Sequence, residues 1–215
     1  RKQTCDLLPL FEFSTIIISS LELDFILSTV LRTLMGKMLV TRGLVLLKRG
    51  GKIFQVIAAK GLDHSIVGKS IEVEHPLRSI QSAKKLIHAN QQWLELLNSN
   101  QQSLVIPILS QRRIVGYITL GERLTKSPFS ALNKKIIQSL VNLSGTAIEK
   151  ALIINQVKDA NRNLDRKIQE LNTLFDLSKE FNIGLDEKKV VRLVTFALLG
   201  QIGVQSYAIC IRNED

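Results

Sequence analysis

One uninterrupted helical pattern, from about Ser127 to Asn182, constrains what this chain can fold into more than any other feature. Ser127 is a good N-cap, and Pro128 suits the first helical position because the N–H that proline lacks would have no partner there. Apolar residues recur at spacings of three and four along the first half, at Leu132, Ile136, Leu140, Leu143, Ala147 and Ala151. A helix of this length would span roughly 80 Å at about 1.5 Å per residue, more than one small domain needs to cover its own sheet. We therefore expect its second half to lie outside that domain.

The second half of this helix has the pattern of a coiled coil. Its predicted seam consists of Ile154, Val157, Asn161, Leu164, Ile168, Leu171 and Phe175. Charged residues of both signs surround the seam, as expected for a solvated helix that pairs along one stripe. A polar Asn161 in the seam would cost stability but fix the register of pairing. The sequence therefore predicts a parallel homodimer, and the alternative is a helix that folds back on its own domain.

Length and cysteine content limit the class of protein. The 215 residues suffice for one domain with an appendage or for two small domains. Cys5 and Cys210 lie far apart without a CxxC spacing, so we expect neither a disulfide framework nor a metal site. No apolar run reaches the roughly 20 residues that a membrane helix needs. We expect a cytoplasmic protein without membrane insertion, and, because the chain stops at Asp215 inside a patterned segment, a piece of a longer one.

The formal net charge of +10 raises the question of nucleic-acid binding. Between Asp24 and Asp63 the chain carries basic residues but no acidic residue, which predicts a basic face. Few aromatic residues accompany these charges, and the sequence has no helix-turn-helix, zinc-finger or RNA-recognition signature. We therefore expect no specific nucleic-acid partner. A solvated basic face, or one that meets acidic partners or anionic lipid, is the expectation.

Upstream of the long helix, the pattern predicts helices and two β-hairpins. Helices are expected over 7–20 and 22–40, and the apolar face of the second consists of Phe25, Ile26, Val30, Leu34 and Met38. Strands are expected over 43–49 and 52–61 around a Gly50-Gly51 turn, and over 103–109 and 113–122 around a polar turn. Residues 62–100 between the hairpins give a mixed signal, with a short strand over 71–74 and turns of helix. The sequence thus predicts an α+β fold, an antiparallel sheet covered by helices.

A repeat appears near the end of the chain. The segment LFEFS at 10–14 returns as LFDLS at 174–178, and the offset of 164 residues holds without a gap to the end of the chain. The chain is therefore expected to hold one whole domain over 1–150 and the N-terminal part of a second, truncated domain over 174–215. Residues 151–183 form the helical linker, continuous with the helix from 128.

These elements resemble those of tandem GAF-domain proteins of bacterial signalling. The resemblance rests on SLVIPI at 103–108, on IVGYITL at 114–120 and on the long helix that follows, and it covers about 7–150 and again 174 onward. It implies a GAF-like antiparallel sheet flanked by helices, with a long C-terminal coiled-coil signalling helix. It also implies a regulatory region joined to an output domain, such as a metal-dependent stress-response-type protein phosphatase, a histidine kinase or a nucleotide cyclase.

No catalytic motif accompanies this resemblance. The chain has no HExxH, no GxSxG and no paired carboxylates in a recognisable acid–base setting. The segment GLDHSIVGKS at 61–70 imitates a phosphate loop, but six residues separate its glycines instead of four, and a strand rather than a helix is expected to follow. We therefore expect the chain itself to be non-catalytic.

The resemblance implies a small-molecule pocket between the sheet and the irregular middle of the chain. The side chains most able to line it are His75, Arg78, His88, Trp93 and Tyr117. In the alternative interpretation, Trp93 covers the sheet edge and Tyr117 belongs to the core. A covalent bilin is not expected, because neither cysteine falls in the pocket half, and the sequence supports neither haem nor a cyclic nucleotide. The cofactor thus stays unidentified.

Two functions follow from these expectations. In the first, the chain is a sensory module that binds a small molecule and relays its state through a dimeric helix to the output domain. In the second, the pocket is degenerate, and the chain only dimerises and spaces the output domains.

Overall fold

The structure is a computed structural model that describes residues 7–86 and 91–181, with the separate positions 191, 192, 195, 196, 199, 208 and 210. The chain divides into two compact units, 1–156 and 157–215. Helix α4 (Ala131–Phe181) belongs to both. The second domain predicted over 174–215 falls, after Phe181, almost wholly outside the described residues, as do Cys5 and His88. That prediction therefore stays untested.

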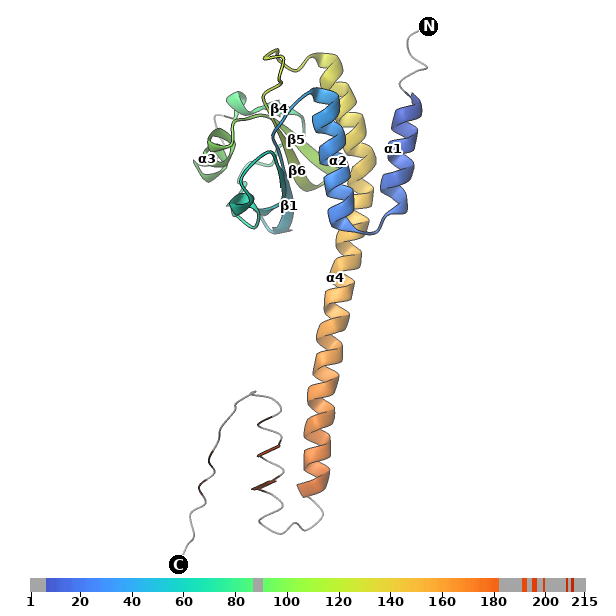
Figure 1. The fold of residues 1–215 in the computed structure, drawn as a ribbon, viewed down its shortest axis with the longest axis vertical. Helices are drawn as coiled ribbons and strands as arrows, with labels where there is room; N and C mark the ends of the chain where they lie inside the picture. Colours follow the sequence, from blue (N-terminus) through green and yellow to red (C-terminus); the bar gives the residue numbers. More distant parts are fainter. Residues whose placement is uncertain are drawn as a thin grey trace, which may run out of the picture. The chain divides into compact units, whose positions relative to one another are not determined.

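The first unit is built on a six-stranded antiparallel sheet (Figure 1). Its strands are β1 (Gly43–Gly50), β2 (Ile53–Lys60), β3 (Ser70–Glu72), β4 (Gln81–Ser82), β5 (Gln102–Ser110) and β6 (Arg113–Gly121), in the order β3-β2-β1-β6-β5-β4. Both predicted hairpins are confirmed, β1 with β2 and β5 with β6. Because β1 also pairs with β6, the tips of the two hairpins lie at the same end of the sheet.

Two residues in the second hairpin behave as their chemistry predicts. Proline has no amide donor and is therefore expected at an edge. Strand β4 pairs only with Leu104 and Val105, so Pro107 lies beyond the end of β4 on that side of β5. A Cβ atom on Gly116 would lie 2.2 Å from the carbonyl oxygen of Leu46, so only glycine allows β6 this close to β1.

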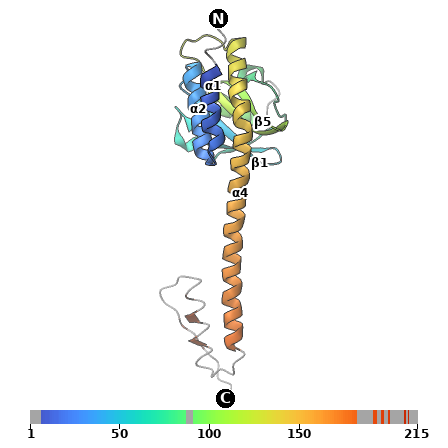
Figure 2. The same ribbon diagram turned by 90° about the vertical axis from the view of Figure 1, so that its right-hand side faces the viewer.

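Helix α2 (Leu23–Met38) and the first part of α4 cover one face of the sheet, and α1 (Leu7–Ser19) packs outside them, as Figure 1 and Figure 2 show. Both N-terminal helices begin and end within two residues of the predicted positions. The face predicted for α2 is wrong at Phe25, which is 45% exposed. Leu27 and Leu31, which follow Ile26 and Val30 directly in the sequence, complete the buried stripe instead.

The start of α4 differs from the prediction. The helix begins at Ala131, not at Pro128, because Ser130 rather than Ser127 caps it. The Asn133 N–H donates to Ser130 Oγ at 3.1 Å, and the Ser130 N–H donates to Asn133 Oδ1 at 3.0 Å. This reciprocal pair satisfies two amides at the helix end. Ser127 Oγ instead accepts a hydrogen bond from the Arg123 guanidinium at 2.8 Å.

The first part of α4 packs tightly on β5. Its buried residues are Ile137, Leu140, Val141, Ser144, Ala147, Ile148 and Ala151. The predicted apolar stripe is therefore wrong at Leu132 and Leu143, which are exposed. A Cβ on Gly145 would lie 2.1 Å from the Leu109 carbonyl oxygen, which explains a glycine in mid-helix. Glu149 accepts a 2.5 Å hydrogen bond from Ser110 Oγ, so α4 is fixed to the end of β5.

Helix α3 (Gln91–Ser99) and the irregular segments around it cover the opposite face. Short 3-10 turns, η1 (His64–Ile66) and η2 (Ala83–Lys85), occur in this region, and residues 81 and 82 form β4 where a turn of helix was predicted. Alternate residues of β1 enter the two cores, with Val45 on the α4 side and Leu46 on the α3 side. Because both faces of the sheet are covered, β1 is apolar at successive positions rather than alternating.

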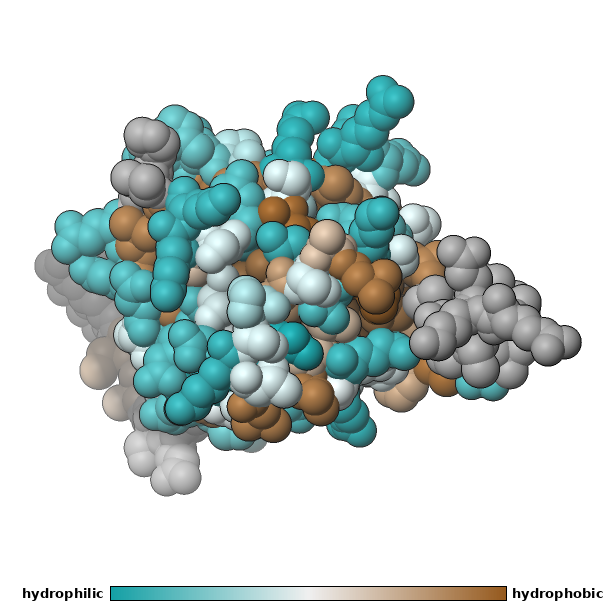
Figure 3. Space-filling view, turned by 90° about the horizontal axis from the view of Figure 1, so that it is seen from above, coloured by the Kyte–Doolittle hydropathy of each residue, from teal (hydrophilic) through white to brown (hydrophobic). Residues whose placement is uncertain are grey.

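The observed architecture confirms the predicted fold class, an α+β sheet flanked by helices with a long C-terminal helix. The surface seen from above is mainly hydrophilic, with separate hydrophobic patches (Figure 3). Among the helices that the structure describes, none combines the length and the apolar character that crossing a membrane requires.

Candidate functional site

Three aromatic side chains fill the core on the α3 side of the sheet. Trp93 of α3, Tyr117 of β6 and Phe54 of β2 are all buried, with exposed fractions of 1%, 0% and 3%. The Tyr117 ring centroid lies 5.8 Å from that of Trp93 and 5.0 Å from that of Phe54, each pair tilted by 51°. Tilted contacts at these distances are favourable beyond the area they bury. The cluster therefore stabilises the packing of α3 on the sheet.

The hydroxyl of Tyr117 has a partner within this core. The backbone N–H of Leu77 donates to Tyr117 Oη at 3.0 Å, which holds the segment between β3 and β4 against the sheet. Burial raises the pKa of Tyr117 to about 12, and the hydrogen bond from Leu77 opposes that rise. Since the folded state holds the phenolic proton more tightly, this stabilisation is present below pH 10 and is lost as the pH rises through about 12.

The structure brings some of the five predicted pocket residues together and leaves others apart. Trp93 and Tyr117 are in contact inside the core. His75 and Arg78 lie on either side of Leu77 and are exposed, and His88 lies outside the described residues. The position of Tyr117 matches the alternative in which it is a core residue. Whether these residues bind a ligand stays a prediction.

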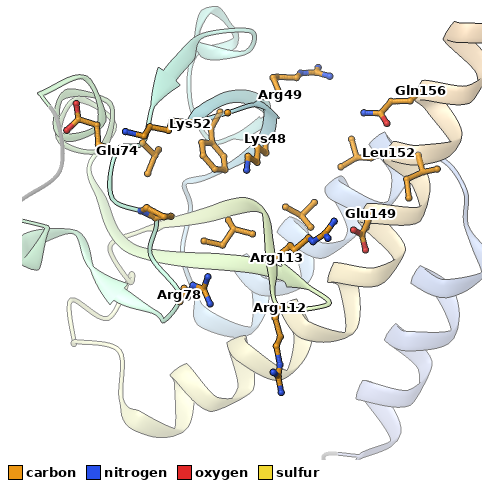
Figure 4. Close-up of a pocket in the computed structure, with 18 residues that line it drawn as sticks. Lys48, Arg49, Lys52, Glu74, Arg78, Arg112, Arg113, Glu149, Leu152 and Gln156 are labelled. Atoms are coloured by element: carbon orange, nitrogen blue, oxygen red, sulfur yellow. The ribbon is translucent and has the colours of Figure 1, made fainter.

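A cleft of about 720 Å³ lies at the end of the sheet where the two hairpins turn (Figure 4). Its walls come from the β1–β2 turn, the β5–β6 turn, the segment after β3 and residues 149–156 of α4. The cationic side chains that line it are Lys48, Arg49, Lys52, Arg78, Arg112 and Arg113. Two carboxylates, Glu74 and Glu149, also line it, which leaves a formal excess of four positive charges.

Apolar side chains also line the cleft. Phe54, Val73 and Val115 are buried in the two cores, whereas Ile114 and Leu152 are half-buried and Ile153 is exposed. Such a combination of apolar and polar lining residues is typical of small-molecule sites of 300–1,000 Å³, roughly the range in which this cleft falls. Of the four predicted pocket residues that the structure describes, Arg78 alone lines it.

Sequence reasoning missed the cleft because its walls come from segments that only the pairing of β1 with β6 brings together. The available signals were the basic window between Asp24 and Asp63 and the Arg112-Arg113 pair in the second turn. Neither indicates which charges share a surface. Within the described part of the chain, no group of three or more histidine, cysteine, aspartate or glutamate side chains is placed to hold a metal ion.

The second half of α4 carries an exposed apolar stripe. In the predicted seam, Val157, Leu164, Ile168, Leu171 and Phe175 are each more than half exposed. Charged pairs lie beside this stripe, such as Lys167 with Glu170 at 2.6 Å. Surface ion pairs of this kind contribute little to stability. A long helix with an exposed apolar stripe is stabilised in water when another apolar surface covers the stripe.

The comparisons with known proteins identify the fold. No protein-family model matches the sequence, and no curated protein matches it either. Solved structures do match part of the chain. The GAF domains of phosphoenolpyruvate-protein phosphotransferases from Acinetobacter and Coxiella burnetii are 18% and 17% identical to this chain, with TM-scores of 0.55 and 0.56. They cover 71% and 70% of this chain and 97% and 96% of their own.

A third similar structure is the GAF domain of a two-component sensor histidine kinase from Bacillus halodurans. It is 19% identical with a TM-score of 0.50, and the match covers 63% of this chain and 99% of that one. At these identities the likeness shows the fold alone. The matched part of this chain therefore has the GAF fold.

Proposed function

We propose that this chain is a sensory and regulatory module of a bacterial signal-transduction protein. In this proposal it binds a small molecule and relays its state through a dimeric helix to an output domain. The observation that carries the proposal is the difference between the two halves of α4. The first half buries one face as far as Ala151, and the second half exposes an apolar stripe from Val157 onward. The GAF fold adds support, since similar structures are domains of phosphotransferases and of a sensor histidine kinase.

The pattern of the stripe favours a parallel dimer. Its residues alternate in steps of three and four, so Ile154, Asn161 and Ile168 take the first core position of each heptad. Val157, Leu164 and Leu171 take the second core position. Isoleucine at the first position with leucine at the second favours two parallel strands, and one asparagine at the first position fixes their register.

The relay needs two arrangements of the helix with different affinities for the ligand, because a ligand that binds both equally shifts nothing. The proposed organisation is a GAF domain over 1–150, a helical linker over 151–183 and the start of a second GAF domain over 174–215. A phosphatase, histidine kinase or cyclase would follow in the longer cytoplasmic protein. The pocket predicted from the sequence, with His75, Arg78, His88, Trp93 and Tyr117 as its candidate residues, is one proposed ligand site.

A specific observation favours the second function, that of a ligand-free scaffold. Trp93, Tyr117 and Phe54 occupy the α3 side of the sheet, and the Tyr117 hydroxyl already has a partner in Leu77. A ligand that entered there would have to displace these contacts. In the scaffold function, the domain positions α4 for dimerisation without sensing anything.

A native mass spectrum of the purified chain tests the proposal. We expect a dimer that carries a discrete additional mass, because both the seam and the ligand survive gentle desolvation. A bare dimer favours the scaffold function. A monomer without a bound molecule at micromolar concentration contradicts both functions, since each requires the seam to pair.

A further inference from the structure

We propose that the cleft at the hairpin tips is a binding site for a small organic anion that carries two or more negative charges, such as an organic phosphate or a polycarboxylate. This inference deepens the proposed function, because it names the class of ligand and a site other than the predicted pocket. It rests on the geometry and charge of the cleft itself. Only the role of the anion as a signal rests on the proposed function.

The two hairpin turns concentrate positive charge at one point. Lys48, Arg49 and Lys52 come from the first turn and its flanks, and Arg112 and Arg113 come from the second. Leu47 of β1 pairs with Gly116 of β6, so the two turns are neighbours across the sheet. Like charges in adjacent turns repel one another, and a bound anion would relieve that repulsion.

Three ion pairs within 4.0 Å, Arg162 with Asp159 and Glu170 with Arg166 and Lys167, lie on the second half of α4 and include none of the cations that line the cleft. Glu149, the carboxylate on the α4 side of the cleft, is held by the hydroxyl of Ser110. Arg49 donates through Nε to Gln55 at 2.8 Å, which fixes the side chain and leaves its terminal nitrogens for another acceptor. The positive charge of the cleft therefore stays available to a ligand.

The shape of the site favours a small molecule over a macromolecule. Figure 4 shows Lys48 and Arg113 beside a hollow that has Leu152 and Gln156 of α4 on one side, whereas the Arg112 side chain points away from it. The accessible apolar residues of its lining, Ile114, Leu152 and Ile153, can contact the body of a small ligand while arginine and lysine bind its anionic groups. A nucleic-acid backbone needs a longer basic track and, when single-stranded, aromatic platforms.

The position of the cleft also explains how an anion would reach the signalling helix. Its α4 wall, residues 149–156, includes the last buried position of the packed part of α4, Ala151, and the first residue of the predicted seam, Ile154. An anion held by the hairpin tips would attract or repel charges on this part of α4, among them Glu149. Its binding free energy can therefore depend on where the helix lies.

Isothermal titration calorimetry of the full chain at about 0.1 M ionic strength tests the site, with pyrophosphate and citrate as separate probes. We expect at least one of them to bind with one site per chain. The double variant Lys48→Gln/Arg113→Gln should weaken this binding about tenfold or more, since it removes two charge-assisted contacts. A preference for pyrophosphate identifies a phosphate ligand, and a preference for citrate identifies a carboxylate ligand.

The matched control is Arg32→Gln/Lys60→Gln, which removes the same two charges from exposed positions outside the cleft. Its affinity should stay within about twofold of the unmodified chain, because screened charges beyond a Debye length contribute little. Equal weakening by both double variants overturns the proposal, as does a Kd above about 1 mM for both probes. Binding of a duplex oligonucleotide without binding of either small anion also overturns it.

This experiment separates the cleft from the proposed function. Anion binding is measured per chain and does not require a dimer. A chain that binds pyrophosphate but stays monomeric contradicts the relay and keeps the site. A dimer that binds neither probe contradicts the site and keeps the helix pairing.

Discussion

Replacing Trp93 by alanine is expected to lower the free energy of unfolding of the first domain by about 3–5 kcal/mol, the usual cost of emptying a buried aromatic site. Trp93 is 1% exposed and lies in contact with Tyr117, so the substitution leaves a cavity between α3 and the sheet. The helix α3 is only nine residues long and depends on this packing. Urea unfolding followed by circular dichroism measures the loss.

The control for this variant is Tyr117→Phe, which keeps the ring and removes only the hydroxyl that accepts from Leu77. We expect a loss of about 1–2 kcal/mol, because the half-buried Leu77 N–H loses its partner. If Trp93→Ala costs less than Tyr117→Phe, Trp93 is not a core residue, and the predicted open pocket around it gains support.

Replacing Leu164 by aspartate is expected to weaken the dimer by at least about a hundredfold. In the proposed seam the substitution places one unpaired carboxylate from each chain in an apolar contact, at a cost of about 3–5 kcal/mol. The first domain should be unaffected, because Leu164 belongs to the second unit and is exposed in the single chain. Sedimentation velocity over a concentration series gives the dissociation constant.

Asn163→Asp is the matched control, since it adds the same charge at the neighbouring residue, outside the seam. We expect its dissociation constant to stay within a few-fold of that of the unmodified chain. Equal dissociation constants for Leu164→Asp and Asn163→Asp would exclude the seam as the dimer contact and leave the alternative in which the apolar stripe folds against its own chain.

Local signals in the sequence were sufficient for most of the fold. The turn at Gly50-Gly51 and the polar turn at 110–113 each lie between two apolar runs, and both hairpins formed as predicted. Helices α1 and α2 follow from their apolar spacing. The cap of α4 was predicted wrongly at Ser127, because Ser127 Oγ binds the Arg123 guanidinium and Ser130 caps the helix.

The functional surfaces were harder to predict, and for physical reasons. The exposed stripe of α4 follows from a simple heptad spacing, and the solvent exposure of Val157 and Leu171 is consistent with it. The basic cleft depends on β1 lying beside β6, a long-range pairing that no local pattern encodes. Trp93 and Tyr117 are equally suited to a ligand pocket and to a core, and only their packing distinguishes the two.

Disulfide cross-linking along α4 tests the parallel helical dimer, on which the proposed relay depends, most directly. In a background with Cys5→Ser and Cys210→Ser, a single Ile168→Cys substitution places one thiol per chain at a first core position of the seam. In a parallel, in-register pair, equivalent core positions face each other closely enough for a disulfide, whereas Asn163→Cys, at an outer position, does not. We expect mild oxidation to convert the Ile168→Cys chain to a covalent dimer and leave the Asn163→Cys chain monomeric on a denaturing gel. No cross-link at position 168, or equal cross-linking at both positions, would contradict the parallel seam and with it the relay.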